Sequence, residues 1–219
     1  MRILLPALAI VLHTLTLPAQ SLQARFIGQM AFSITDGTVT LITDFPYQVG
    51  YAGAPPFADR ELQTSTRPTL ALITHRHLDH WEPALFSKTN WKVVAPPDAM
   101  ERIKSDRALP LSSRIEFGPM VIEPFETPHA RIGHYSYIVT WHGTRLYFSG
   151  DTESPDSLLA AKGLDVAFVS PWQFQSAQRR GGKIDAKRVV IYHHEAGQHV
   201  PGCTGSCLVP RQGETLDIR

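Results

Sequence analysis

Residues 74–81 read THRHLDHW, which places three histidines and one aspartate within eight positions. The run that leads into them, TLALITH (69–75), is short and apolar, as expected of a buried strand. If this strand persists, His75 and His77 project to the same side, because alternate strand residues share a face, and Asp79 can follow them. Imidazole and carboxylate groups are ordinary metal ligands. The stretch therefore suggests a metal site at the carboxyl end of a strand, with a solvated polar turn as the alternative.

Further candidate ligands follow other predicted strands. His129 in ETPHA comes just past a strand, Asp151 in FSGDT lies in a turn that contains glycine, and IYHHEAG ends a strand with His193 and His194. Taken singly, His129 is unremarkable and Asp151 could belong to an ordinary turn. Adjacent strand residues face opposite sides, so only one of His193 and His194 can face a metal. The order of these residues along the chain is what favours one composite site.

The remaining pattern predicts a β-rich α/β domain. Two strand-like runs in residues 29–45 are joined by Asp36-Gly37, a strong hairpin signal, and His142-Gly143 marks a second hairpin turn. Residues 47–68 are rich in Gly and Pro and predict an irregular loop. Further strands are expected within residues 91–97, 113–130, 133–152, 164–172 and 185–194, a hairpin-like tail over 207–218, and helices within 83–90, 97–108 and 154–163.

The chain has 219 residues, a length that suits one domain with a sizeable core. Residues 1–21 combine one cation, an apolar run, and the small residues Ala19 and Ser21 at the positions that a signal peptidase reads. We interpret this segment as a secretory signal, since its apolar run is shorter than the roughly 20 residues of a membrane span. Residues 22–219 would then form a single domain in the periplasm or outside the cell.

Charge and cysteine content limit the partners and the compartment. Without residues 1–21 the chain carries 20 cations and 20 anions, so it lacks the basic excess expected of a nucleic-acid-binding protein. A small-molecule substrate is expected instead, with no stable membrane insertion once the signal is removed. Cys203 and Cys207 could close a disulfide in an oxidising compartment, which would contribute about 2 kcal/mol. Two cysteines alone do not complete a structural zinc site.

The ordered set HxHxDH, a lone histidine, SGD and a late histidine resembles the metallo-β-lactamase superfamily over about residues 31–218. The chain is most similar to the hydrolase branch that includes ascorbate-6-phosphate lactonase and similar zinc-dependent hydrolases. The resemblance implies an α/β fold, the four-layer αββα sandwich in which two mixed β-sheets lie face to face with helices outside. Asp44, in TLITDF, matches the strand-end aspartate of the superfamily's first motif.

Carried over residue by residue, the resemblance implies two metal ions with these ligands: His75, His77 and His129 on one ion, Asp79, His80 and His194 on the other, and Asp151 bridging. Asp44 would support a ligand from behind. Asp79 and His194 are also expected to act in catalysis. Matching Tyr192-His193-His194 to the Pro-Met-His of many relatives favours His194 over His193. Zinc is the expected metal, with manganese or iron as alternatives.

The implied function is that of a binuclear metal-dependent hydrolase, whose metal-bound hydroxide attacks an ester, lactone, thioester or phosphoester bond. Asp151 argues against a true β-lactamase, because antibiotic-hydrolysing members generally carry Cys or Ser at this position. A metal-binding module of the same fold without turnover is the other alternative. It is favoured by the irregular final ligand and the short loops.

Several other polar and aromatic residues receive weaker interpretations. In residues 170–183, Arg179, Arg180 and Lys183 could hold an anionic substrate group, but a solvated flexible loop is the favoured interpretation. Trp81 and Trp172 could wall a pocket, although core packing is the more frequent environment of tryptophan. A surface or strand-packing role is expected for the three histidines that fit no ligand position: His134, His142 and His199.

Overall fold

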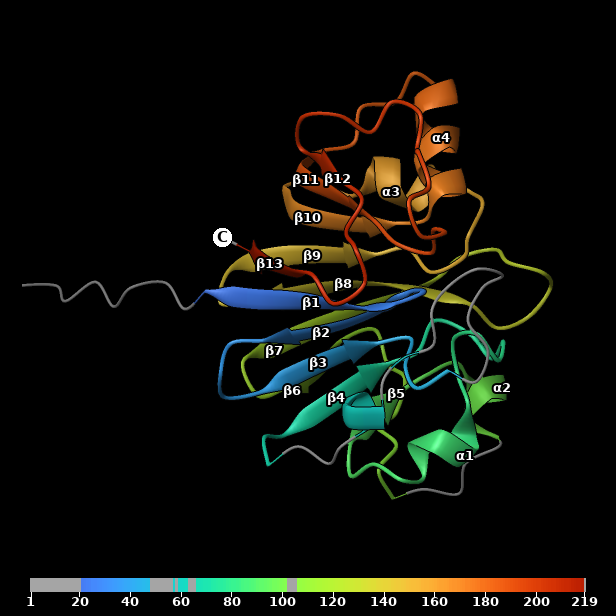
Figure 1. Ribbon diagram of the computed structural model, residues 1–219. Coiled ribbons are helices and arrows are strands. Elements are labelled where there is room, and N and C mark those ends of the chain that lie inside the picture. The colour runs from blue at the N-terminus through green and yellow to red at the C-terminus, as the bar shows by residue number, and fades with distance from the viewer. Residues whose placement is uncertain (1–20, 48–56, 58, 63–65, 102–105, 219) are drawn as a thin grey trace, which may run out of the picture.

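The computed structural model describes residues 21–47, 57, 59–62, 66–101 and 106–218. Two mixed β-sheets lie face to face, as Figure 1 shows, with short helices at their outer sides. The predicted α/β sandwich with two mixed sheets is confirmed. The predicted signal segment, residues 1–21, lies outside the described residues except for Ser21, and most of the predicted irregular loop does so as well.

The first sheet has the strand order β13-β1-β2-β3-β4-β5. Strand β3 runs parallel to β4 and β4 parallel to β5, whereas the remaining pairs are antiparallel. The carboxyl ends of β3, β4 and β5 therefore meet at one edge. The strands are β1 (Leu22–Gly28), β2 (Ala31–Thr35), β3 (Thr40–Thr43), β4 (Thr69–Leu72), β5 (Lys92–Val94) and β13 (Thr215–Ile218).

The second sheet has the order β12-β11-β10-β9-β8-β7-β6. Strands β9 to β12 are parallel to one another, and β6 to β9 form an antiparallel meander. The strands are β6 (Ile115–Phe117), β7 (Met120–Glu126), β8 (Tyr135–Trp141), β9 (Thr144–Phe148), β10 (Leu164–Val169), β11 (Ala186–Ile191) and β12 (Cys207–Leu208).

Buried apolar side chains form three clusters. The central cluster joins the inner faces of both sheets, for example through Phe32 of β2 and Phe168 of β10. Phe86 packs a helix against the outer face of the first sheet, and Leu158 and Phe174 do the same on the second sheet. The helices are α1 (Pro83–Phe86), α2 (Pro97–Met100), α3 (Asp156–Ala160), α4 (Pro171–Arg179) and the 3₁₀ turn η1 (Asp59–Leu62). Within the described part of the chain, no helix has the length and apolarity of a membrane span.

Both predicted hairpin turns are present. Gly37 has a φ of 91° between β2 and β3, and His142 and Gly143 have φ values of 50° and 80° between β8 and β9. The left-handed backbone of a tight hairpin favours Asn, Asp or Gly at these positions, and His142 adopts it as well. These two turns lie at the same end of the sandwich, because each precedes a strand, β3 or β9, whose carboxyl end lies at the opposite end.

The interpretation of residues 170–183 as a flexible loop is wrong, because most of this segment is helix α4. Ser170 caps the helix, since its side chain accepts a hydrogen bond from the backbone N–H of Gln173, and Pro171 occupies the first helical turn. Both features are known signals of a helix start. Phe174 and Ala177 then bury one face of the helix against the second sheet.

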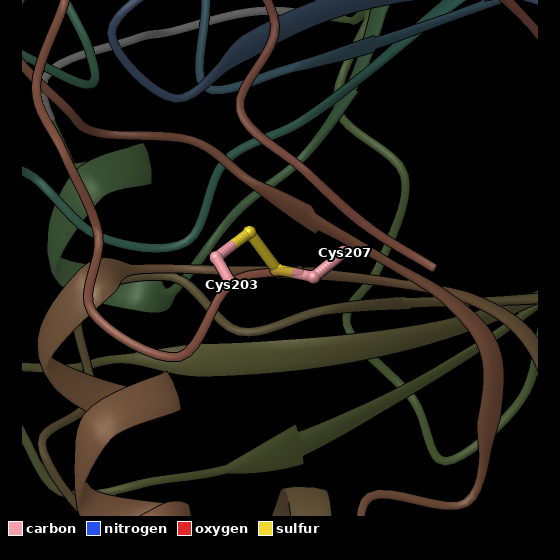
Figure 2. Close-up of a disulfide and its surroundings, with 2 residues drawn as sticks. All are labelled: Cys203 and Cys207. Atoms are coloured by element: carbon pink, nitrogen blue, oxygen red, sulfur yellow. A yellow bond between two sulfur atoms is a disulfide. The ribbon is translucent and has the colours of Figure 1, made fainter. Parts of the chain in front are cut away.

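The C-terminal tail is not the expected hairpin. Strand β12 pairs with β11 in the second sheet, whereas β13 pairs with β1 in the first, so the tail crosses from one sheet to the other. Strand β1, which the sequence did not indicate, supplies the partner for β13. The disulfide between Cys203 and Cys207, the first residue of β12, closes the predicted short loop (Figure 2).

Candidate metal centre

The predicted ligands converge because they follow strands that point the same way. Asp44 follows β3, residues 74–80 follow β4, His129 follows β7, Asp151 follows β9, and His193 follows β11. Strands β3 and β4 are parallel in one sheet, and β9, β10 and β11 are parallel in the other. Their carboxyl ends meet at one edge of the sandwich, where polar loops can gather around a shared site.

Three overlapping groups of side chains at this edge could each hold a metal ion. Within each group the ligand atoms lie no more than 4.8 Å from one another. The groups are His75, His77 and His129; His75, His80 and Asp151; and Asp79, His80 and His193. Because His75 and His80 each belong to two groups, the three groups form one continuous cluster.

Asp151 occupies the middle of the cluster. Its Oδ2 atom lies 3.3 Å from Nε2 of His80, 3.6 Å from Nε2 of His193 and 4.0 Å from Nε2 of His75. On one side, Nε2 of His75 and Nδ1 of His77 are 2.9 Å apart. The carboxylate of Asp151 therefore lies beside residues predicted to bind each of the two ions, and its role as a bridging ligand stays a prediction.

Among the described residues, the cluster includes His193, whereas His194, the predicted ligand and catalytic residue, belongs to none of the three groups. Nε2 of His193 lies 3.4 Å from Oδ2 of Asp79. His194 instead stacks on Phe26, with ring centroids 5.4 Å apart, and its Nδ1 donates to the Glu195 carbonyl. Strand β11 ends at Ile191 and His193 has a φ of 53°, so the alternation assumed for an unbroken strand does not reach these residues.

Buried atoms without hydrogen-bond partners test whether the cluster fits a metal. Both ring nitrogens of His129 and Oδ1 of Asp151 have no hydrogen-bond partner among the described residues. Leaving such atoms unsatisfied costs free energy, and native proteins rarely do so without a reason. Nitrogen and carboxylate oxygen donors suit zinc, and also manganese or iron. The set of nitrogen and oxygen donors, with buried atoms that no hydrogen bond satisfies, therefore fits a transition-metal site.

Asp44 lies behind the cluster, next to Thr74 and His80. Its side chain is almost completely buried and accepts hydrogen bonds from the backbone N–H and the hydroxyl of Thr74, at 2.7 and 3.0 Å. Oδ2 of Asp44 also lies 3.4 Å from Nδ1 of His80. An acidic partner at Nδ1 holds the proton there, which leaves Nε2 of His80 to face the other ligands.

The protonation of the histidines is set by burial and by the two buried aspartates. Burial lowers the pKa of His75 and His129, so both rings are held in the neutral form that binds metals. Burial also opposes a charge on His80, but Asp151 and Asp44 outweigh it and raise the pKa of His80. Without metal, a proton on His80 thus balances the carboxylates, and a metal ion would replace that proton.

Two residues near the cluster were not recognised as site residues from the sequence. Trp172 donates from Nε1 to the carbonyl of Asp151 at 3.2 Å, and its ring edge meets His193. His134 is fully buried, and its Nε2 accepts a hydrogen bond from the backbone N–H of Asp151 at 2.9 Å. Its spacing after His129 on the same turn is the only signal that could have indicated it. By contrast, Trp81 packs in the apolar core, as expected.

Comparisons with known proteins show the family of the chain. The β-lactamase superfamily domain model matches residues 49–200. A UPF0173 metal-dependent hydrolase from Deinococcus radiodurans is 29% identical over 218 residues, which cover 90% of this chain and 94% of that protein.

Solved structures show the same fold. Igni18, a metallo hydrolase from the archaeon Ignicoccus hospitalis, superposes with a TM-score of 0.65 at 17% identity, covering 91% of this chain and 99% of that one. The metallo-β-lactamase fold protein YhfI from Bacillus subtilis has a TM-score of 0.66 at 12% identity, covering 90% and 99%. The chain therefore belongs to the β-lactamase superfamily, and the prediction that it is a metal-dependent hydrolase of this superfamily is confirmed.

Proposed function

We propose that this hydrolase uses two metal ions to cleave an ester, lactone, thioester or phosphoester bond of a small molecule. The observation that carries the proposal is that Asp151 belongs to the middle one of three ligand groups, which shares His75 with one neighbouring group and His80 with the other. One group, with His77 and His129, lies on the side of His75, and another, with Asp79, lies on the side of His80 and His193. This arrangement provides two separate sets of ligands around one carboxylate.

The roles of the side chains follow from their contacts. Bound in this cluster, a pair of divalent ions would supply a water acidic enough to ionise near neutral pH and a Lewis acid for the bond under attack. Asp151 keeps the two ligand sets together, and Asp44 orients His80. Gln29 donates from its side-chain amide to Oδ2 of Asp79 at 3.2 Å, which holds that carboxylate toward the cluster.

A groove beside the cluster supports the assignment of a small-molecule substrate. It has a volume of about 1070 Å³ and is lined by His129, by Arg131, by Glu153 and Ser154, and by Ser176 and Arg180 of the α4 region. Its inclusion of His129 places the groove directly against the proposed metal centre. Arg180 pairs with Asp156 and lines the groove, whereas Lys183 lines a separate surface hollow. Of the three cations considered from the sequence, Arg180 is the one that lines this groove, which favours it as a contact for an anionic substrate group.

The bond class rests on Asp151 and on the superfamily, and the similarity to the branch of ascorbate-6-phosphate lactonase stays a prediction.

We also propose that the protein is exported. The apolar segment of residues 1–21 supports export, and the Cys203–Cys207 disulfide supports it as well, because such bonds persist in oxidising compartments. Mass spectrometry of the protein recovered from the periplasm or medium should give a mature chain that begins near residue 22.

Metal analysis combined with a substrate panel tests the proposed function. The purified chain, loaded with zinc, should bind two equivalents and hydrolyse at least one member of a panel of lactones, thioesters, phosphodiesters and β-lactams. A chelator should abolish the activity. His129→Ala should lose metal and activity, whereas His199→Ala, which alters an exposed histidine, should keep both. Failure on the whole panel by a fully loaded protein would favour a metal-binding module, and a preference for β-lactams would favour a true β-lactamase.

A further inference from the structure

His134 belongs to none of the three ligand groups, yet it is completely buried against them. Its ring centroid lies 5.3 Å from that of His75 and 5.3 Å from that of His129. Burying an imidazole in this way costs free energy unless both ring nitrogens are hydrogen-bonded. Both nitrogens of His134 do have partners, and the identity of those partners indicates what the residue does.

The hydrogen bond to Asp151 fixes the tautomer of His134. The backbone N–H of Asp151 points at Nε2 at 2.9 Å, and a backbone N–H can only donate. Nε2 is therefore the acceptor, and the ring proton resides on Nδ1. Nδ1 in turn donates to Oγ1 of Thr127 at 2.7 Å. One ring thus connects the turn after β9 with the end of β7.

The series of hydrogen bonds from Asp151 through His134 to Thr127, called the relay below, continues through two hydroxyl groups and returns to the turn after β9. Ser136 donates to the carbonyl of Ser149 at 2.7 Å, so its oxygen accepts from Thr127 at 3.0 Å. Each donor in the series has one acceptor, and the direction of every step is fixed by the carbonyl at one end and the N–H at the other. The closed series begins at Asp151 and ends at Ser149, two residues earlier in the chain.

Gly150, between these two residues, allows the ring to approach so closely. It has a φ of 60°, and a Cβ at this position would collide with Nε2 of His134 and lie 2.9 Å from Cβ of Thr74. Non-glycine residues rarely adopt this backbone conformation, and here there is also no space for a side chain. The Gly in the SGD sequence is therefore explained by the contact with His134.

We propose that His134 is a positioning residue for Asp151. The imidazole holds the backbone of the turn, and the turn fixes the carboxylate between the two ligand sets. This inference rests on the proposed metal centre, but it concerns metal affinity and not the bond that is cleaved. The role requires an acceptor at the position of Nε2. In the histidine, the hydrogen bond from Nδ1 to Thr127 keeps the ring proton on Nδ1, so that Nε2 stays free to accept.

A matched pair of substitutions at His134 distinguishes the contribution of the Nε2 position from that of the Nδ1 position. The amide of Gln reaches the position of Nε2 and can accept from Asp151, whereas the shorter amide of Asn reaches only the position of Nδ1. Calorimetric zinc titration of the metal-free full chain should show zinc affinity weakened about 10- to 100-fold in His134→Asn, as is typical when such supporting partners are lost. His134→Gln should restore most of the affinity. Equal affinities of the two variants would overturn the proposal, whether both resemble the wild type or both are weakened.

A second pair of substitutions, at Thr127, leaves His134 itself unchanged. It keeps the proposal testable if the variants of His134 fail to fold. Thr127→Val preserves the shape of the side chain but removes the acceptor for Nδ1–H, so the ring proton can move to Nε2 and oppose the N–H of Asp151. Zinc binding should weaken in Thr127→Val and recover in Thr127→Ser. Unchanged zinc binding in Thr127→Val would contradict the relay. If the wild type binds zinc but cleaves no substrate, the proposed hydrolysis fails while this binding test still decides the role of His134.

Discussion

Aspartate and histidine side chains lie together at both ends of the sandwich, but the two ends differ in whether the hydrogen-bonding atoms of these side chains have partners. At the end formed by the hairpin turns, Asp36 accepts hydrogen bonds from the backbone N–H groups of Thr38 and Val39, from Nε1 of Trp141 at 3.2 Å, and from Nε2 of His142 at 2.8 Å. At the other end, the ring nitrogens of His129 and Oδ1 of Asp151 have no hydrogen-bond partner among the described residues. Aspartate and histidine side chains therefore have all their partners at the hairpin-turn end, called the closed end below, and lack some at the metal-centre end, called the open end.

This difference separates a structural contact from a binding site. Asp36 joins the β2–β3 turn of one sheet to the β8–β9 turn of the other, and every partner that it needs is supplied by the chain. The cluster around Asp151 contains buried ligand atoms for which the described residues supply no hydrogen-bond partner, and these atoms could be satisfied by a metal ion. Histidine-rich composition alone would not have distinguished the two ends, since His142 also lies beside a carboxylate.

The largest effect is expected from His193→Ala, which removes a ligand from the open end. The kcat/KM for the best panel substrate should fall at least about 100-fold, because metal ions supply several kcal/mol of transition-state stabilisation. The zinc content should also fall. His194→Ala is the matched control, and its kcat/KM should stay within about tenfold of the wild type, since His194 stacks on Phe26 outside the cluster. If the two variants exchanged these outcomes, the assignment of His193 would be wrong.

A smaller effect, on stability, is expected from Asp36→Asn at the closed end. The substitution weakens hydrogen bonds to a charged group and should lower the free energy of unfolding by about 1–3 kcal/mol at pH 7. Zinc content should not change, because this turn lies at the far end of the sandwich. Urea denaturation and metal analysis of the same preparation check both statements, and a loss of zinc in the folded variant would contradict the separation of the two ends.

The pH dependence of this stability difference has a definite sign. Burial acts to raise the pKa of Asp36, but the hydrogen bonds from Val39, His142 and Thr38 outweigh it and hold the pKa below its ordinary value. A carboxylate with a lowered pKa contributes stability above its unfolded pKa, about 3.9, and loses it as the pH falls toward the folded value. The gap between wild type and Asp36→Asn should therefore be full above about pH 5 and shrink below about pH 4. A gap that widens in acid would contradict this assignment.

The smallest effect is expected from Trp172→Phe at the open end. The variant keeps an aromatic ring against His193 but removes one hydrogen bond to the Asp151 carbonyl, which is worth about 1 kcal/mol. Zinc affinity should weaken about fivefold, as measured by calorimetric titration. A loss as large as that of His193→Ala would show that Trp172 does more than orient the backbone of Asp151.

Much of the fold was predictable because short sequence patterns indicate its turns and strands directly. Asp36-Gly37 and His142-Gly143 indicated two hairpins, and both are present where turn chemistry placed them. Helix α4 differs from the predicted loop, because the polar residues after Ser170 and Pro171 resemble a solvated loop although these two residues are ordinary helix-start signals. The tail was wrong for a different reason. Which sheet receives β12 and which receives β13 depends on partner strands far away in the sequence, and no local pattern reports them.

The sequence by itself determined the kind of chemistry. The spacing of His75, His77, Asp79 and His80, followed by His129 and Asp151, identified the superfamily, because ligand types and their order are recorded in the chain. Only the tertiary structure brings His193 and not His194 into the cluster, and only it brings His134 against the backbone of Asp151. Those outcomes depend on a left-handed backbone at His193 and on a ring that contacts a turn 17 residues away in sequence. Strand alternation and residue type do not encode such contacts, since packing between separate elements determines them.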